Sequence, residues 1–323
     1  MPSPKSTPLT SITLILSPYH VGHPSTGPGL GPSFLLSHNL LLALQSLGIP
    51  VHTASIPASA ISSAEGEIGR TFTLLRETSV FVSAARGSGS FPLVLAGNCC
   101  ASVGVAAGVL LADSSSGKDF DDEREGKEAA ELGCVWFDAH DDYNTPDTLM
   151  SGYLDSMGVA MLAGECWKSL LGTVPGFRPM DLKRVVHVGM RDVTDAERQR
   201  VVDSGMDLVW GNSGKRVDFA GEFGVVLERK RLGRTFVHVD LDCLDVSLGQ
   251  VNKFAAPGGL LGDDLGACLE RVANLTVPAS LTVASFDPSY DGADNIARIA
   301  VQAVKGFVEA LIAKGVVTAQ SEA

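Results

Sequence analysis

Short apolar runs, many of them rich in β-branched residues, recur along this chain and alternate with longer stretches that have a helical pattern. The apolar runs have the length and composition of buried strands: 12–16, 51–54, 91–96, 133–138, 185–188, 208–210, 235–240 and 281–286. The stretches between them are amphipathic or alanine-rich: 31–47, 64–85, 103–112, 195–203, 263–273 and 293–314. Strands that alternate with helices form parallel sheets, and strands that are apolar throughout are buried on both faces. The pattern predicts a doubly wound, mostly parallel α/β sheet between two helix layers, with active-site residues at the carboxyl ends of its strands.

Metal-seeking side chains gather at the end of the run 133–138, in the segment Asp138-Ala-His140-Asp141-Asp142. If the strand continued through this segment, Asp138, His140 and Asp142 would lie on one face, because strand side chains alternate between the two faces. Carboxylates brought together away from water are unfavourable unless their charge is neutralised. The spacing therefore predicts a bound metal ion.

A second pair of carboxylates, Asp240 and Asp242, ends the run 235–240 in the same way. Two strands that each deliver oxygen or imidazole ligands at their carboxyl ends are what a two-metal site between parallel strands requires. The alternative is that some of these residues cap helices or form ion pairs. The metal site is the favoured interpretation, because five candidate ligands are aligned at two strand ends.

Composition narrows the class of protein further. The chain has 323 residues, of which 45% are hydrophobic, and we expect one domain spanning 1–323 because the candidate ligands lie in both halves. A net charge of -12 argues against nucleic acid, which normally needs a basic patch, and favours a small-molecule substrate. The six cysteines lack zinc-ribbon or secreted-scaffold spacing, and no stretch approaches membrane-spanning length. We therefore expect reduced thiols, no membrane contact and a cytoplasmic protein, with frayed ends at 1–8 and 318–323 and an acidic surface insertion at 113–131.

The two ligand motifs resemble those of the ureohydrolase superfamily (arginase, agmatinase and formimidoylglutamase), whose usual forms are Asp-Ala-His-x-Asp and Ser-x-Asp-x-Asp-x-x-Asp-Pro. Further matching segments extend the resemblance over nearly the whole chain: 96–100, 189–192, 258–260 and 287–288. The resemblance implies a three-layer α/β/α sandwich, two divalent metal ions, most often Mn²⁺, and a homo-oligomer, either a trimer or a hexamer.

The resemblance also implies a role for each ligand. Asp138 and Asp240 would bridge the two metals, Asp142 would bind the first, and His140 and Asp242 would bind the second. Water held by two divalent ions becomes hydroxide near neutral pH and can attack an electrophilic carbon. Asp142 would accept a proton or a hydrogen bond from that nucleophile.

One departure from the family pattern lies in the metal site itself. The family segment Gly-Gly-Asp-His-Ser supplies a histidine to the first metal, whereas this chain has Cys99 at that position. A thiolate is softer than an imidazole and would favour Zn²⁺ or Fe²⁺ relative to Mn²⁺, although four carboxylates pull the other way. Cys99 could instead be only a small core residue.

Two more departures concern substrate recognition and proton transfer. Ser285 stands where arginase-like enzymes place a glutamate against the substrate guanidinium, and a buried guanidinium without that partner would be penalised by roughly 3 to 5 kcal/mol. Asp287 or Asp291 could supply a displaced carboxylate, and Asp287 could equally be a turn residue. Asp155 replaces a histidine that often shuttles protons; it could do so only with a raised pKa, or it could be a helix N-cap.

Of the segment that binds the amino-acid end of the substrate in arginases, Asn144, Ser151 and Glu197 remain. Asn144 and Ser151 could hydrogen-bond a carboxylate or an amide, although Asn144 could also belong to a turn.

Other histidines are weaker signals. His20 and His23 follow the first strand in a loop that should face the same pocket, whereas His187 and His238 precede strand ends and are expected to be hydrogen-bonded core residues.

These residues predict a metal-dependent hydrolase that cleaves a C–N bond of a linear guanidine, amidine or amide through a metal-bridged hydroxide. The missing glutamate points away from ordinary arginine hydrolysis and towards a neutral or modified substrate, such as an N-hydroxylated or acylated one. One rival is a catalytically silent family member with a binding or regulatory role. Another is a different metal-assisted reaction, such as deacetylation or a rearrangement, on the same scaffold.

Overall fold

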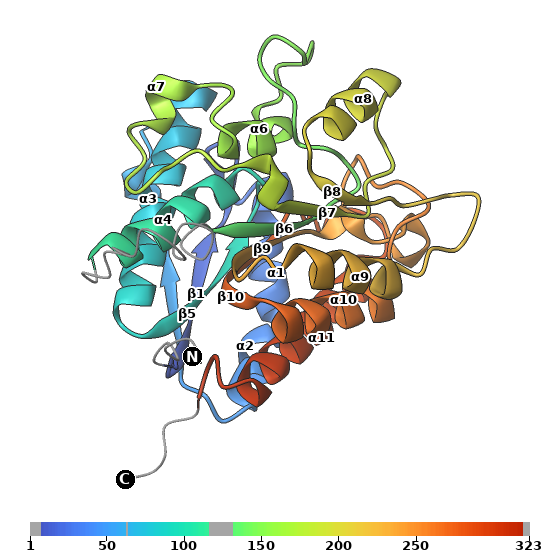
Figure 1. The fold of residues 1–323 in the computed structure, drawn as a ribbon. Coiled ribbons are helices and arrows are strands. Elements are labelled where there is room, and N and C mark those ends of the chain that lie inside the picture. Colours follow the sequence, from blue (N-terminus) through green and yellow to red (C-terminus); the bar gives the residue numbers. More distant parts are fainter. Residues whose placement is uncertain (1–7, 63, 116–131, 319–323) are drawn as a thin grey trace, which may run out of the picture.

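A parallel sheet of eight strands runs through the centre of the computed structural model, which describes residues 8–62, 64–115 and 132–318 (Figure 1). The strand order is β4-β1-β5-β10-β9-β6-β7-β8 and every pairing in the sheet is parallel. The strands are β1 (Ser11–Ser17), β4 (Val51–Ser55), β5 (Ser90–Ala96), β6 (Gly133–Phe137), β7 (Val185–Val188), β8 (Asp207–Val209), β9 (Arg234–Asp240) and β10 (Val277–Ala284). The α/β sandwich expected from the alternating apolar runs is confirmed.

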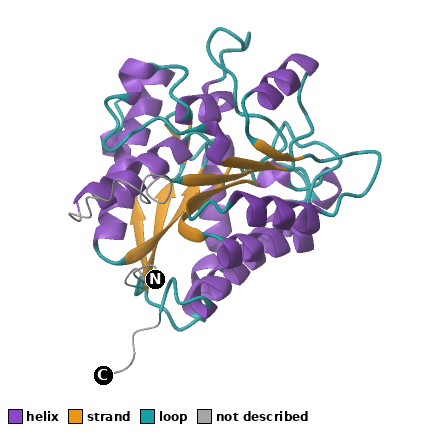
Figure 2. Cartoon of the chain, viewed as in Figure 1, coloured by secondary structure: helices purple, strands orange, loops and turns teal. Residues whose placement is uncertain are grey.

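Helices cover both faces of this sheet (Figure 2). One hydrophobic core joins the sheet to α1 (Gly31–Ser37), α2 (Leu40–Gln45), α9 (Phe219–Lys230), α10 (Gly262–Leu275) and α11 (Ala293–Ala313). The core on the other face includes α3 (Glu67–Gly87), α4 (Ala101–Ser115), α6 (Gly158–Leu162), α7 (Lys168–Leu171) and α8 (Asp195–Asp203). Helices on both sides explain why the strands are apolar along their whole length.

Side chains of β9 alternate between these two cores. Val237 and Val239 pack in the first core, whereas Phe236 packs in the second. By the same alternation, His238 and Asp240 face the second core. The carboxyl ends of β5, β6, β9 and β10 meet at one edge of the sheet, because the strands are parallel neighbours.

Two helix predictions differ from the structure. The stretch 31–47 forms two helices, because Asn39 adopts a left-handed φ of 66° between α1 and α2. Helices α7 and α9 were not among the expected helices.

The chain ends and the acidic segment are described only in part. Most of the predicted insertion at 113–131 lies outside the described residues, and its first residues, 113–115, belong to α4. Thr318, expected to be frayed, donates its backbone N–H to Leu9 O at 2.8 Å.

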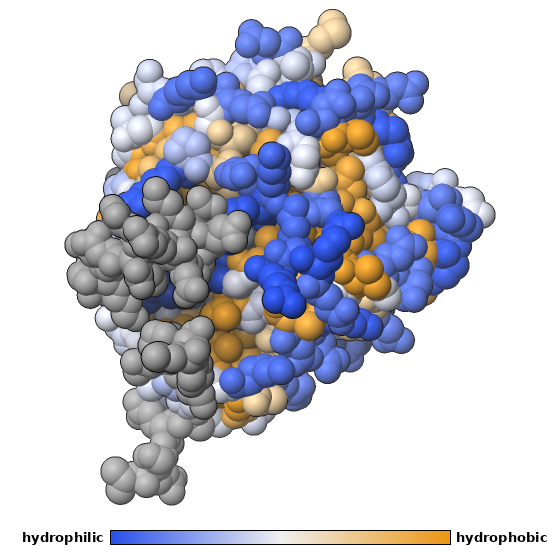
Figure 3. Space-filling model, in the orientation of Figure 1, coloured by the Kyte–Doolittle hydropathy of each residue, from blue (hydrophilic) through white to orange (hydrophobic). Residues whose placement is uncertain are grey.

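Short elements and the surface complete the description. A two-stranded hairpin, β2 (Tyr19–His20) and β3 (His23–Pro24), follows β1. Single 3₁₀ turns lie at Gly27–Leu30, Ala58–Ala60, Leu154–Met157, Leu182–Arg184, Leu241–Cys243 and Val246–Leu248. On the face shown in Figure 3, hydrophobic side chains form patches separated by hydrophilic ones. Among the described residues, no helix is both long and apolar enough to cross a bilayer.

Candidate active site

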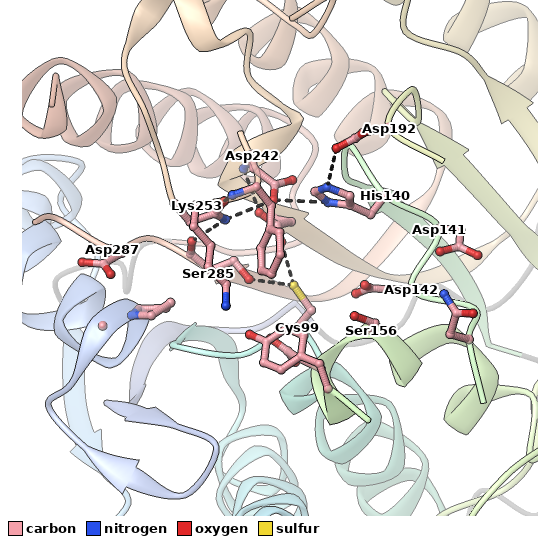
Figure 4. Close-up of a pocket in the computed structure, with 18 of the residues that line it drawn as sticks. Cys99, His140, Asp141, Asp142, Ser156, Asp192, Asp242, Lys253, Ser285 and Asp287 are labelled. Atoms are coloured by element: carbon pink, nitrogen blue, oxygen red, sulfur yellow. Dashed lines mark hydrogen bonds and ion pairs between the residues drawn. The ribbon is translucent and has the colours of Figure 1, made fainter. Parts of the chain in front are cut away.

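A cavity of about 230 Å³ opens at the carboxyl ends of the central strands. Most of the predicted site residues line it: Cys99, His140, Asp142, Asn144, Asp155, Glu197, Asp240, Asp242, Ser285 and Asp287. Figure 4 shows several of them pointing towards one another from different segments of the chain. Asp138 lies beneath the cavity and is fully buried.

The segment after β6 is not a continued strand, which corrects the geometry expected from the sequence. β6 ends at Phe137, and Asp138 to Asp142 form a loop in which Asp142 has a left-handed φ of 45°. Asp242 likewise lies in the 3₁₀ turn Leu241–Cys243, and only Asp240 ends its strand. The side chains converge because the loops turn over the sheet edge, rather than by strand alternation.

Asp138, His140 and Asp242 form one group of possible metal ligands, with one ligand atom of each residue within 4.8 Å of the others. His140 Nδ1 lies 3.3 Å from Asp138 Oδ1 and 3.4 Å from Asp242 Oδ2. Asp138 Oδ2 accepts a hydrogen bond from Trp136 Nε1 at 3.1 Å, and Asp242 Oδ2 accepts one from Asn252 Nδ2 at 3.0 Å. The surrounding donors therefore hold both carboxylates in place.

The two other carboxylates at the cavity, Asp142 and Asp240, lie where burial and neighbouring carboxylates disfavour their negative charge. Burial and then the nearby Asp138 raise the pKa of Asp142 well above its ordinary value, and its Oδ2 has no hydrogen-bond partner among the described residues. Burial and the neighbouring Asp242 do the same to the pKa of Asp240. Two buried carboxylates, one of them with a free oxygen, fit a divalent cation, which would neutralise them.

Cys99 lies in this group as a free, fully buried thiol. Its Sγ donates to Asp240 Oδ2 at 2.9 Å and lies 3.0 Å from Ser285 Oγ (Figure 4). Cys99 is thus beside the candidate ligands and also packs in the core around α4. The other cysteines are likewise free and buried: Cys100, Cys134, Cys166, Cys243 and Cys268.

Asp155 is part of the cavity wall and is not a helix cap. It lies within the 3₁₀ turn Leu154–Met157, and the helix that follows begins after Met157 without a side-chain cap. Its carboxylate accepts hydrogen bonds from Asn98 Nδ2 at 2.6 Å and from Cys100 N at 2.9 Å. Burial nevertheless raises the pKa of Asp155, as a proton-transferring carboxyl group requires.

Asn144 and Glu197 form a hydrogen-bonded pair in the cavity lining, whereas Ser151 is outside the cavity. Asn144 Nδ2 donates to Glu197 Oε1 at 2.8 Å, and Glu197 closes a capping box with Thr194 at the start of α8. Burial opposes ionisation of Glu197, but these hydrogen bonds outweigh it and lower the pKa. Ser151 does not line the cavity, because it is exposed in a turn where its Oγ accepts the Tyr153 N–H at 3.3 Å.

Asp287 is both a carboxylate of the cavity and a turn residue, the two roles that the sequence allowed. It lines the cavity, and its Oδ1 accepts hydrogen bonds from Ser289 N and Ser289 Oγ in the turn that follows. His20 also lines the cavity, and burial lowers its pKa. His23 is exposed, with Nε2 3.0 Å from Arg70 Nη2.

The sequence analysis missed the residues around the mouth of the cavity. Lys253 Nζ lies 4.7 Å from the centre of the Phe254 ring and 5.6 Å from that of Tyr153, and all three line the cavity. Asp192 contacts His140 Nε2 at 3.5 Å. These residues lie in irregular segments without periodicity. Of them, only Asp192 belongs to a segment, 189–192, that matches the family pattern.

His187 and His238 are buried, as expected, but they are not fully hydrogen-bonded. Among the described residues, neither ring nitrogen of His187 has a partner, and Nε2 of His238 has none. Both histidines are register partners of Trp136, one on each side of β6. The expectation of hydrogen-bonded core histidines therefore holds only for Nδ1 of His238, which lies 2.8 Å from Ser102 Oγ.

His187 predicts a specific pH dependence of stability. Burial lowers its pKa to about 3, below the ordinary value near 6.5 that it regains on unfolding. The contribution of neutral His187 to the free energy of unfolding is therefore fully present above pH 6.5 and is lost as the pH falls towards 3. The loss amounts to about 3 kcal/mol between pH 7 and pH 4. We expect His187→Leu to remove this part of the pH dependence of the free energy of unfolding. Urea unfolding of the variant and of the unaltered chain, both in the presence of a chelator, measures the difference.

His52 provides the control, because its side chain is exposed. His52→Leu should leave the pH dependence unchanged. An equal slope in His187→Leu and the unaltered chain would contradict a neutral, buried His187.

Comparison with known proteins assigns this arrangement to a family. The model of the Arginase family matches residues 10–308. The chain is 27% identical over 317 residues to the arginase of Glaciozyma antarctica, covering 91% of this chain and 85% of that protein. The chain therefore belongs to the arginase family, whose members are hydrolases acting on carbon–nitrogen bonds other than peptide bonds.

Solved structures support the same fold. The Entamoeba histolytica arginase in complex with L-ornithine superposes with a TM-score of 0.78 at 19% identity, covering 94% of this chain and 99% of that one. Proclavaminate amidino hydrolase from Streptomyces clavuligerus gives a TM-score of 0.65 at 20% identity, covering 96% and 94%.

Proposed function

We propose that this chain is a metal-dependent hydrolase that cleaves a C–N bond in a guanidino, amidino or amide-type small molecule other than free arginine. The observation that carries the proposal is the convergence of five predicted ligands at one cavity: His140, Asp142, Asp240 and Asp242 line it, and Asp138 is fully buried next to them. Family membership supports the reaction class, and the name of the amidino hydrolase shows that this fold serves an amidino substrate in another protein.

The chain offers the donors that two divalent ions need. Asp138 belongs both to the group with His140 and Asp242 and to a second group with Cys99 and His238, so it stands where a bridging carboxylate would. Asp240 and Asp142 are the remaining proposed ligands, and their carboxylates supply negative charge that would balance the charge of the two cations. When bound there, divalent cations would make water more acidic and polarise the substrate. Mn²⁺ is the ion that the family resemblance favours.

The side chains around the ligands would orient the reactants. Asp142 lines the cavity and has one carboxylate oxygen without a partner among the described residues, which suits it to accept a hydrogen bond from the attacking water. Asp155, held by Asn98 and Cys100, faces the same space and could return the proton to the leaving amine. Asn144 and Glu197 also line the cavity and would bind the polar end of the substrate.

Ser285 argues against a guanidinium cation as substrate. Its hydroxyl contacts Cys99, and it places no negative charge at the position where the family pattern has glutamate. We expect Ser285→Glu to tighten binding of a linear alkylguanidinium at least tenfold, because an unpaired buried charge costs about 3 to 5 kcal/mol. Calorimetric titration measures this without requiring turnover.

Ser285→Gln is the matched control, since it adds the same length without charge. A neutral N-acylated analogue should bind the Glu and Gln variants alike. Equal guanidinium affinity in the two variants would show that position 285 does not select charge.

A substrate panel tests the proposal itself. The purified chain, loaded in turn with Mn²⁺, Zn²⁺ or Fe²⁺, should release urea or an amine from at least one linear guanidino, amidino, N-hydroxylated or acylated compound. Protein stripped with a chelator is the control and should be inactive. Metal binding without any product would favour the silent binding protein instead.

We also propose that the chain acts on its small-molecule substrate as a single-domain homo-oligomer, a trimer or hexamer, in the cytoplasm. Family membership supports these expectations, and light scattering of the purified protein would measure the assembly.

A further inference from the structure

A buried imidazole lies directly beneath the candidate metal site. His238 precedes Asp240 by two residues on β9, so both side chains are on the same face of the sheet. The side chain is 0% exposed. Its ring packs against that of Trp136, with ring centres 3.8 Å apart and 30° between the planes. This packing fixes the ring in one orientation.

The two ring nitrogens of His238 have different surroundings. Nδ1 lies 2.8 Å from Ser102 Oγ in the first turn of α4, whereas Nε2 has no hydrogen-bond partner among the described residues. Leaving a buried polar atom unpaired costs about 1 to 3 kcal/mol. The Nδ1–H tautomer, donating to Ser102, directs a free lone pair from Nε2, and this is how ligand histidines are usually oriented.

Metal-binding atoms surround this nitrogen. A ring nitrogen of His238, Cys99 Sγ and a carboxylate oxygen of Asp138 all lie within 4.8 Å of one another, and all three residues are buried. Because Nδ1 already has Ser102 as its partner, Nε2 is the donor left for a metal. Zinc bonds of about 2.0 to 2.3 Å place tetrahedral ligand atoms ~3.3 to 3.8 Å apart, so a small contraction would let these three atoms bind one ion and leave its fourth position open.

We propose that Cys99, His238 and Asp138 form a thiolate–imidazole–carboxylate metal site that selects Zn²⁺ over Mn²⁺. The family pattern takes the imidazole of the first metal from the segment 96–100, where this chain has Cys99; here β9 supplies it. Metal binding releases the thiol proton to solvent, and sulfur with nitrogen donors favours zinc over manganese. This inference rests on the proposed function, because Asp138 is shared with His140 and Asp242.

Cobalt provides a direct test of the ligands. Co²⁺ titrated into the metal-stripped full chain should produce an intense near-ultraviolet thiolate-to-cobalt charge-transfer band, and Cys99→Ser should abolish it. His238→Leu should weaken Zn²⁺ binding at least tenfold in a chelator competition, because it removes a ligand. In the zinc-loaded chain, X-ray absorption should show sulfur at about 2.3 Å.

His187→Leu is the matched control, because it also removes a fully buried imidazole in register with Trp136. It should leave the cobalt band and the zinc affinity unchanged. Should His238→Leu not fold by circular dichroism, His238→Gln keeps a polar side chain and carries the same expectation.

Two results would overturn the inference: no thiolate band with Co²⁺, or equal zinc affinity in the His238 and His187 variants. If that happened while the manganese-loaded chain hydrolysed a guanidino or amidino compound, the proposed function would stand alone. A thiolate band together with no turnover by any metal form would instead support the site and contradict the hydrolase.

Discussion

Asp240→Asn should lower the metal content of the purified chain and reduce hydrolysis about 100-fold or more. Loss of an outer-shell partner already costs 10–100-fold in metal sites, and Asp240 is proposed as a direct ligand. The substitution keeps the shape of the side chain and the oxygen that accepts the Asp242 N–H at 2.7 Å, so the turn after β9 should persist. What it removes is a negative charge at the centre of the cavity floor.

Metal analysis by mass spectrometry and the initial rate on the best substrate of the panel measure the two effects separately. Asp263→Asn is the control, because Asp263 is exposed in the first turn of α10. A folded Asp240→Asn protein with full metal content and a rate within a few-fold of the unaltered chain would exclude Asp240 as a ligand.

The strands and the candidate ligands could be predicted from the sequence for the same physical reason. A strand buried on both faces must be apolar throughout, so its end is marked by the first charged residue. Asp138 and Asp240 mark the ends of β6 and β9 in this way. Because neighbouring parallel strands end at the same edge, residues a hundred positions apart could be assigned to one site.

The surroundings of the ligands could not be predicted in the same way. Lys253, Phe254 and Tyr153 reach the cavity from segments without a periodic pattern. Ser151 was misplaced because the turn around it directs its side chain to solvent. The unpartnered nitrogens of His187 and His238 were missed because hydrogen-bond satisfaction depends on contacts across strands, not on the strand that carries the histidine.

Arg191→Lys should destabilise the fold by about 2 to 4 kcal/mol and weaken metal binding, although Arg191 touches no metal ligand side chain. The guanidinium donates to backbone carbonyls from three separate segments: Gly189, Asp242, Cys243, Leu244, Ala256 and Pro257. One side chain therefore ties the end of β7 to the turn that carries Asp242. Lysine has a compact ammonium with three donors, so at least half of these carbonyls would lose their partner, at about 1 to 3 kcal/mol for each that stays buried.

Arg198→Lys separates this effect from a general loss of guanidinium contacts. Arg198 is exposed and lies over the Trp210 ring at 3.9 Å, without tying segments together, and its substitution should change stability by less than about 1 kcal/mol. Urea unfolding of the metal-stripped proteins gives the stability difference, and chelator competition gives the metal affinity. If Arg191→Lys lost stability but kept full affinity, the turn at Asp242 would hold its geometry through Asn252 and the Ala139 N–H, which donate to the Asp242 carboxylate. If both fell together, Arg191 would be the residue through which the fold positions Asp242 in the group that it forms with Asp138 and His140.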